Sequence, residues 1–92
     1  MKLVVLGGYD RYEGYLKGYA EKMKVDLKFI KKPKPNLEDA LKQADYVIVL
    51  TRLVSHEMLI CAKTYASGKC IYCKQAGLCT LKKLLEKILN NN

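Results

Sequence analysis

The apolar residues of the chain gather in four short runs, and amphipathic stretches lie between them. The runs are Leu3–Leu6, Val25–Phe29, Tyr46–Leu50 and Cys70–Cys73. The first and third are continuously apolar and rich in valine or isoleucine, a pattern typical of strands buried on both faces. In the second run Val25, Leu27 and Phe29 alternate with charged residues. This alternation predicts a half-exposed strand at an edge of a sheet.

The stretches between the runs have the spacing of helices. The first helix carries a stripe of apolar residues at offsets of 0, 3, 4, 7 and 11: Tyr12, Tyr15, Leu16, Tyr19 and Met23. Four polar residues are predicted to cap the four helices: Asp10, Asn36, Ser55 and Thr80. Gly14 and Gly18, four residues apart on the first helix, predict a flat groove for close backbone packing.

The alternation of strands and helices predicts one α/β domain over residues 1–92. The crossovers are long enough for right-handed parallel connections, and the half-polar second strand belongs at an edge. We therefore expect a Rossmann-like, flavodoxin-like three-layer domain with a four-stranded parallel sheet in the order 2-1-3-4.

In this strand order the direction of winding reverses between the first and third strands, which opens a crevice at the carboxyl edge of the sheet. The loops of residues 7–11 and 51–56 border that crevice. Ser55 and His56 open the helix after the third strand, and His56 is the single histidine of the chain. The pattern therefore predicts a ligand site between these two loops.

The composition and net charge indicate which kinds of partner the protein could bind. The chain has 17 Lys and Arg against 9 Asp and Glu, a formal net charge of +8, which favours an anionic ligand, although many lysines are also typical of thermostable surfaces. The basic run of residues 28–34 lacks neighbouring exposed aromatic residues, so we interpret it as a solvated loop and expect no nucleic-acid partner. No run approaches the ~20 apolar residues of a membrane span, and no secretory signal is visible. We expect a cytoplasmic protein without a membrane partner, whose four cysteines are thiols.

Four sequence elements together resemble a known family. They are LVVLGG at residues 3–8, ADYVIVLT at residues 44–51, VSH at residues 54–56, and Lys63-x-x-Ala66 before Gly68-Lys69. These elements are similar to a small bacterial and archaeal family catalogued as domain of unknown function 2325. The resemblance implies a compact Rossmann-like fold and a ligand site at the Ser-His element. It also implies haem binding through the histidine of that element, which is His56 in this chain.

The chain differs from the family pattern at two places, and these differences bear on the kind of metal site to expect. Many members carry a His-rich, Asp-Gly element after the second strand, where this chain has lysines and prolines at residues 31–35. Arg52 follows Thr51 at a position where an acidic residue is frequent. A two-histidine metal site is therefore not expected here.

The presence of only one histidine in the chain favours some metal cofactors over others. Zinc needs three or four protein ligands, whereas haem brings four nitrogens and needs one axial bond from the protein. We therefore expect a non-enzymatic haem carrier or sensor, with the iron bound by His56. The other residues expected to contact the cofactor are Gly7, Gly8, Tyr9, Arg11, Tyr12, Arg52, Leu53, Val54, Ser55 and Met58. Among these, Arg11 and Arg52 can pair with the two propionates.

A phosphate or nucleotide is the alternative ligand for the same crevice. The amides of Gly7 and Gly8 and the helix N-terminus at Ser55 would hold it. The turn lacks the GxGxxG pattern, and no lysine completes a P-loop. No catalytic set of side chains emerges either, so we do not expect an enzyme.

The cysteines and the small sheet predict two further properties, the pairing of the thiols and the oligomeric state. Cys70 and Cys73, three apart on a strand, should point to opposite faces and so cannot form a chelating or redox pair. Cys73 and Cys79 could approach one another across the intervening loop. We expect a homo-oligomer, because the last strand and helix are lightly covered and the tyrosine face of the first helix is not wholly buried.

Overall fold

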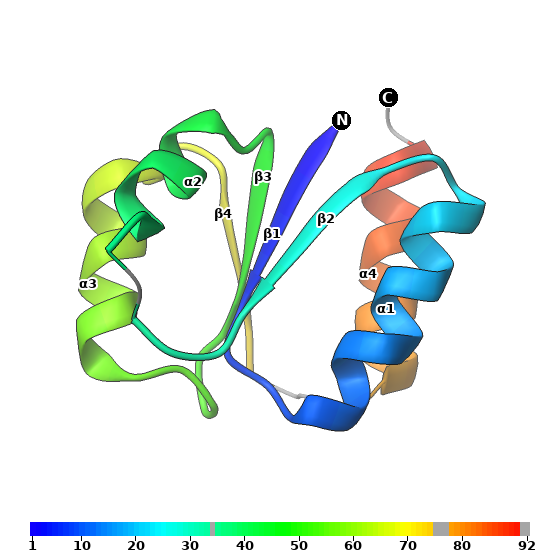
Figure 1. The fold of residues 1–92 in the computed structure, drawn as a ribbon, viewed down its shortest axis with the longest axis horizontal. Helices are drawn as coiled ribbons and strands as arrows, with labels where there is room; N and C mark the ends of the chain where they lie inside the picture. Colours follow the sequence, from blue (N-terminus) through cyan, green and yellow to red (C-terminus); the bar gives the residue numbers. More distant parts are fainter. Residues whose placement is uncertain (34, 75–77, 91–92) are drawn as a thin grey trace.

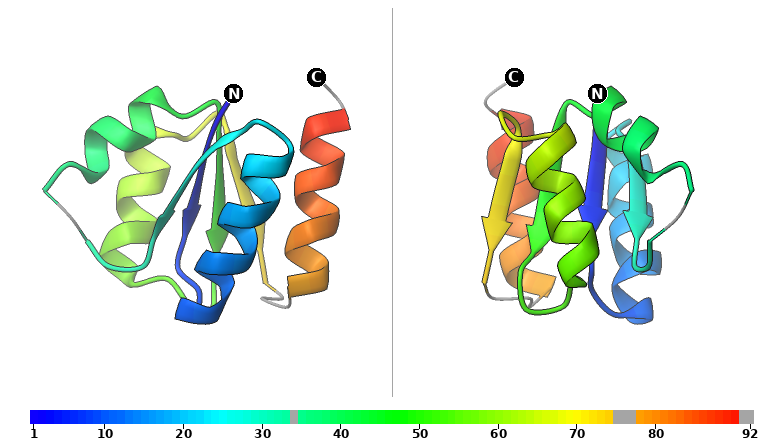
Figure 2. Two further views of the ribbon diagram at one scale, coloured as in Figure 1. Left: turned by 45° about the vertical axis from the view of Figure 1, so that its right-hand side comes forward. Right: turned by 90° about the vertical axis from the view of Figure 1, so that its left-hand side faces the viewer.

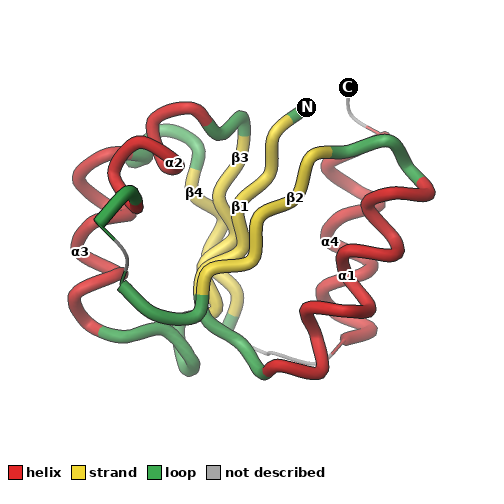
Figure 3. The backbone as a smooth tube through the Cα atoms, in the orientation of Figure 1, coloured by secondary structure: helices red, strands yellow, loops and turns green. Residues whose placement is uncertain are grey.

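The computed structural model describes residues 1–33, 35–74 and 78–90. Strands and helices alternate along the chain: β1 (Lys2–Leu6), α1 (Asp10–Lys22), β2 (Asp26–Ile30), α2 (Leu37–Gln43), β3 (Tyr46–Leu50), α3 (His56–Tyr65), β4 (Cys70–Cys73) and α4 (Leu78–Asn90). All three strand pairs are parallel, in the order β2-β1-β3-β4 (Figure 1). The predicted α/β class and strand order are confirmed. The tube in Figure 3 shows the loops after β1 and β3 at the same edge of the sheet.

Helices cover both faces of the sheet and produce three layers. α1 and α4 pack on one face, and α2 and α3 on the other (Figures 1 and 2). Val5 belongs to the same buried cluster as Leu16 of α1, whereas Val4 belongs to that of Leu41 of α2. Because both faces are covered, β1 and β3 carry apolar side chains at successive positions, which explains their unbroken runs in the sequence. None of the described helices is both long and apolar enough to cross a membrane.

The buried face of α1 differs from the predicted stripe. Tyr12, Leu16 and Ala20 are buried, whereas Tyr15 and Met23 are 45% and 43% exposed. Tyr15 lies at the flank of the stripe, and Met23 follows the last helical residue, so neither reaches the sheet. The prediction that the tyrosine face is not wholly buried is confirmed for Tyr15.

Gly14 and Gly18 lie on the solvent side of α1. Nothing lies within 4 Å of a Cβ atom built on either glycine. Both residues are on the helix surface opposite Leu16, which faces the sheet. The predicted groove for close backbone packing is therefore wrong.

The four predicted caps behave differently. Thr80 lies inside α4, which begins at Leu78, so that cap prediction is wrong. The Ser55 hydroxyl accepts a hydrogen bond from the Met58 amide (3.2 Å), as predicted. Asn36 occupies the N-cap of α2, but its side chain makes no cap bond. Asp10 already lies inside the first turn of α1, and its carboxylate pairs with Lys31 at the end of β2. The prediction for Asp10 is wrong because this long-range ion pair, which the local sequence does not show, engages its side chain.

Candidate functional site

The two loops of the predicted crevice lie at the carboxyl edge of the sheet and lead to opposite faces. After β1 the chain turns through Gly7 and Gly8 into α1, and after β3 it turns through residues 51–55 into α3 (Figures 1 and 2). Gly7 and Gly8 have φ angles of +89° and +109°, in the left-handed region that favours glycine. The Gly7 amide donates to the Ile30 carbonyl (2.9 Å), which ties this turn to the end of β2.

Gly7 and Gly8 are closely packed against neighbouring segments. A Cβ atom on Gly7 would lie 3.0 Å from the Leu53 carbonyl and from the Val54 nitrogen. A Cβ atom on Gly8 would lie 2.7 Å from the Phe29 ring. Glycine is therefore required at both positions, and the two loops touch where Gly7 meets Leu53 and Val54.

The structure separates the predicted contact residues into a buried and an exposed group. Tyr12 and Met58 are 5% and 0% exposed, in the cores on opposite faces of the sheet. They support the loops from beneath and do not share a surface. The predicted contact residues with exposed or half-buried side chains are Tyr9, Arg11, Arg52, Leu53, Val54, Ser55 and His56.

Tyr9, Arg11 and Tyr12 form a cation–aromatic cluster at the start of α1. The guanidinium carbon of Arg11 lies 5.1 Å from the ring centroid of Tyr9 and 5.5 Å from that of Tyr12. The two rings meet edge to face, with their centroids 5.4 Å apart. Tyr9 is 48% exposed, so the cluster presents an aromatic ring beside a positive charge to solvent.

Two carboxylates of α1 neutralise Lys31. Its ammonium pairs with Asp10 and lies 3.3 Å from Glu13, which also pairs with Lys17 at 3.0 Å. The hydrogen bond and charge of Lys31 hold the pKa of the Asp10 carboxyl below its ordinary value, and Lys17 and Lys31 do the same for Glu13. Arg11 in the first turn of α1 and Arg52 on the loop before α3 make no ion pair with other described residues, so both charges stay available to an anionic ligand.

His56 begins α3 on the solvent side of that helix. Its side chain is exposed and, among the residues that the structure describes, makes no hydrogen bond or ion pair. Leu59, Ile60 and Lys63 follow at offsets of 3, 4 and 7, so they share this side of the helix. Ile60 is 50% exposed, Leu59 is half-buried and Lys63 is exposed. We name these four residues the α3 outer face.

The sequence-based site omitted three members of the α3 outer face. The sequence does indicate these three residues, because Met58 and Ala62 identify the opposite side of α3 as the buried side. Once those residues are assigned to the core, the positions nearest His56 on the helix surface follow from the helical repeat. Leu59 and Ile60 place aliphatic surface beside the imidazole, and Lys63 adds a positive charge.

The cysteines of β4 point to opposite faces, as predicted. Cys70 Sγ donates to the Ala62 carbonyl (3.5 Å) on the α3 side, whereas Cys73 is buried in the core beneath α1 and α4. Burial raises the pKa of the Cys70 thiol. The predicted approach of Cys73 to Cys79 depends on a loop that includes residues 75–77, which lie outside the described residues. Within the described chain, no three His, Cys, Asp or Glu side chains cluster so as to hold a metal ion.

Comparisons with known proteins cover nearly the whole chain. A family model described as an uncharacterized protein conserved in bacteria (DUF2325) matches residues 2–88. A UPF0751 protein of Desulfitobacterium hafniense (strain Y51) is 34% identical over 95 aligned positions, which cover 95% of this chain and 93% of the relative. No solved structure matches the chain. Both similarities include the loops at the carboxyl edge of the sheet, and neither description states a ligand.

Proposed function

The chain belongs to the DUF2325 family, and we propose that it is a small, non-enzymatic haem-binding domain in which His56 is an axial ligand. One observation carries this proposal: the His56 imidazole is exposed and has no hydrogen-bond partner within the described chain. Haem brings four nitrogen ligands of its own, so a single imidazole is enough to attach it. When bound, it would supply an iron centre for a carrier or sensor.

The α3 outer face fits a haem that is seated on the protein surface. Leu59 and Ile60 offer aliphatic contact to a porphyrin, and Lys63 offers a charge for a propionate. Arg52, exposed on the loop that leads into α3, is a second cation. A haem held by these exposed residues would remain accessible to solvent. Such a seat suits a carrier that passes haem on better than a protein that stores it.

Other ligands are less well supported. Zinc requires at least three protein ligands, and the described residues offer no such group. A phosphate at the glycine turn would need donors that are already used, because the Gly7 amide donates to the Ile30 carbonyl. At the start of α3 the Met58 amide is likewise used, because it donates to the Ser55 hydroxyl. We therefore favour haem over a nucleotide.

Titration of the purified protein with ferric haem, followed by the Soret band, tests the proposal. The native protein should shift the band at one equivalent, and His56→Ala should remove this shift. Lys83→Ala, an exposed change on α4, is the matched control and should bind as the native protein does. Ile60→Glu should weaken binding without changing the final spectrum, because it removes apolar contact but leaves the imidazole. An unchanged spectrum and affinity in His56→Ala would contradict the assignment.

A nucleotide ligand predicts a different pattern of results. The titrated protein would then show no Soret shift, and a thermal-shift screen would find stabilisation by nucleotides through mass action. That stabilisation would depend on Arg11 or Arg52 and would survive the His56→Ala substitution.

A further inference from the structure

The outer edge of β2 is open. β2 is the end strand of the sheet, beyond β1 (right-hand view of Figure 2). A cleft of about 600 Å³ follows this edge between α1 and α2. Glu13 and Lys17 of α1 line one side, and Asn36, Asp39 and Gln43 of α2 line the other. The cleft therefore has polar sides, and the strand itself forms its floor.

The ladder between β1 and β2 determines which backbone groups face this cleft. The amide of Asp26 and the carbonyl of Ile30 both bond toward the β1 side, at 3.0 and 2.9 Å. In a parallel ladder, residues that bond one neighbouring strand alternate with residues that face away from it. Lys28 therefore also bonds β1, and Leu27 and Phe29 direct their N–H and C=O groups into the cleft.

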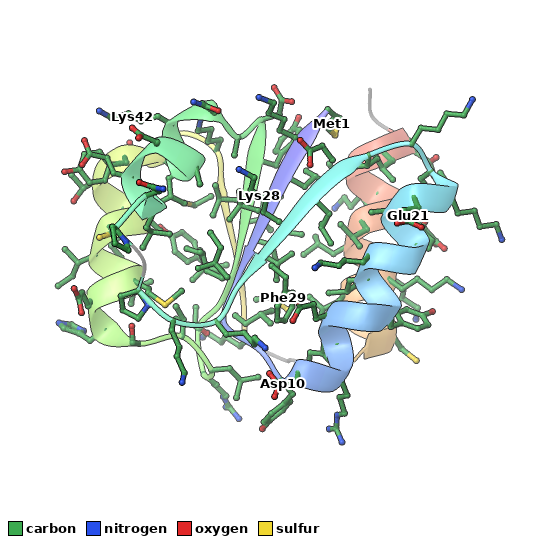
Figure 4. All side chains as sticks on the ribbon, in the orientation of Figure 1. Met1, Asp10, Glu21, Lys28, Phe29 and Lys42 are labelled. Carbon is green, nitrogen blue, oxygen red and sulfur yellow. The ribbon has the colours of Figure 1, made fainter. Side chains whose placement is uncertain are left out.

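The side chains along the edge carry opposite charges two residues apart. Asp26 and Lys28 are exposed and lie on the same face of β2. Figure 4 shows Lys28 on the α2 side of the strand and Phe29 on the α1 side. Neither Asp26 nor Lys28 forms an ion pair with another described residue. In an antiparallel pair of two β2 strands, the acidic residue of each strand can therefore lie opposite the basic residue of the other.

We propose that two copies of the chain pair through antiparallel β2 edges, with Leu27 opposite Leu27, and form one continuous sheet. In this register the two Leu27 residues exchange N–H···O=C bonds. The Phe29 amide of each copy donates to the Val25 carbonyl of the other. Asp26 of each copy then lies opposite Lys28 of the other, at closely spaced positions where side chains interact directly.

Charge selects this register among its neighbours. When two β2 strands pair about a two-fold axis and their side chains lie on the same faces of the joined sheet, one residue lies opposite the same residue of the other copy. If that residue is Asp26 or Lys28, like charges face one another, which destabilises the pair. If it is Phe29, Lys28 faces Ile30 and the pairing runs past the end of β2. Only the register centred on Leu27 joins both acidic side chains to both basic side chains within the strand.

Sedimentation velocity over a range of micromolar concentrations tests this interface, independently of the haem proposal. The native protein should show a reversible dimer. Asp26→Lys and Lys28→Asp should each raise the dimer dissociation constant at least ~10-fold, because each converts two attractive pairs into two repulsive ones. The double variant, with both substitutions, should restore the native dissociation constant. An equimolar mixture of the two single variants should form a heterodimer.

Two further measurements complete the test. Lys83→Asp, the same charge change on the exposed side of α4, should leave the dimer unchanged. Amide hydrogen exchange at Leu27 and Phe29 should be slow in the native dimer and fast in Asp26→Lys. A native protein that stays monomeric overturns the proposal and leaves the edge to a strand of another protein. A dimer that tolerates both single substitutions also overturns it, since the interface would then lie elsewhere.

Discussion

Alanine at positions 14 and 18 should stabilise the protein. Both glycines lie inside α1, and a Cβ atom on either would meet nothing within 4 Å. Glycine weakens a helix interior because its backbone loses more conformational freedom on folding than that of any other residue. With no neighbour to displace, the substitution removes this cost and introduces no clash.

The size of the effect follows from the difference in helix propensity. Alanine is about 1 kcal/mol more favourable than glycine in an exposed helix interior, so the double variant should gain about 2 kcal/mol of unfolding free energy. In a domain of this length, each kcal/mol raises Tm by roughly 4–8 °C. Gly8→Ala is the opposite control. Its φ of +109° and a Cβ atom 2.7 Å from the Phe29 ring should cost about 1–3 kcal/mol.

Urea unfolding followed by far-UV circular dichroism measures both effects. The midpoint for Gly14→Ala/Gly18→Ala should rise with an unchanged slope, which identifies a true gain in stability. A lower midpoint with the same slope would refute the reasoning. It would mean that these positions are covered in solution or that their backbone is not helical.

Two other predictions concern an ion pair of α1 and the reactivity of two cysteines. Lys31 holds the pKa of the Asp10 carboxyl below its ordinary value, so the stability from this pair is present at neutral pH and is lost as pH falls below about 4. Lys31→Met should therefore lose stability less steeply in acid, as shown by urea midpoints at a series of pH values, and parallel curves for the two proteins would contradict this. Cys79 is exposed, whereas burial raises the pKa of the Cys70 thiol. Iodoacetamide followed by peptide mass spectrometry should find Cys79 alkylated before Cys70, and the reverse order would contradict the described burial.

The fold could be predicted because each strand and helix carries its own signal. Tyr46–Leu50 is apolar at successive positions because helices cover both faces of β3, and Asp26–Ile30 alternates because β2 lies at an edge. Ser55 was predictable as a cap because the relevant hydrogen bond spans three residues. These signals depend only on residues that are close in the sequence.

The remaining features depend on contacts between distant segments. Gly7 lies against the backbone at Leu53, and this contact joins the loop after β1 to the loop after β3. The pairing of Asp10 with Lys31 joins the start of α1 to the end of β2. The periodicity of apolar residues along the sequence predicts neither contact. The α3 outer face lies outside the two loops that the strand order indicates, so the topology alone does not point to it.

The central claim is that His56 binds the iron of haem, and the chain has one histidine. A sample labelled with ¹⁵N only in histidine therefore gives imidazole signals from a single residue. As ferric haem is added, these signals should disappear or shift far outside their normal range at one equivalent, because the ring nitrogen is bonded to a paramagnetic iron. If haem binds, as judged by the Soret band, while the His56 ring signals keep their original positions and intensities, His56 is not the ligand of the iron.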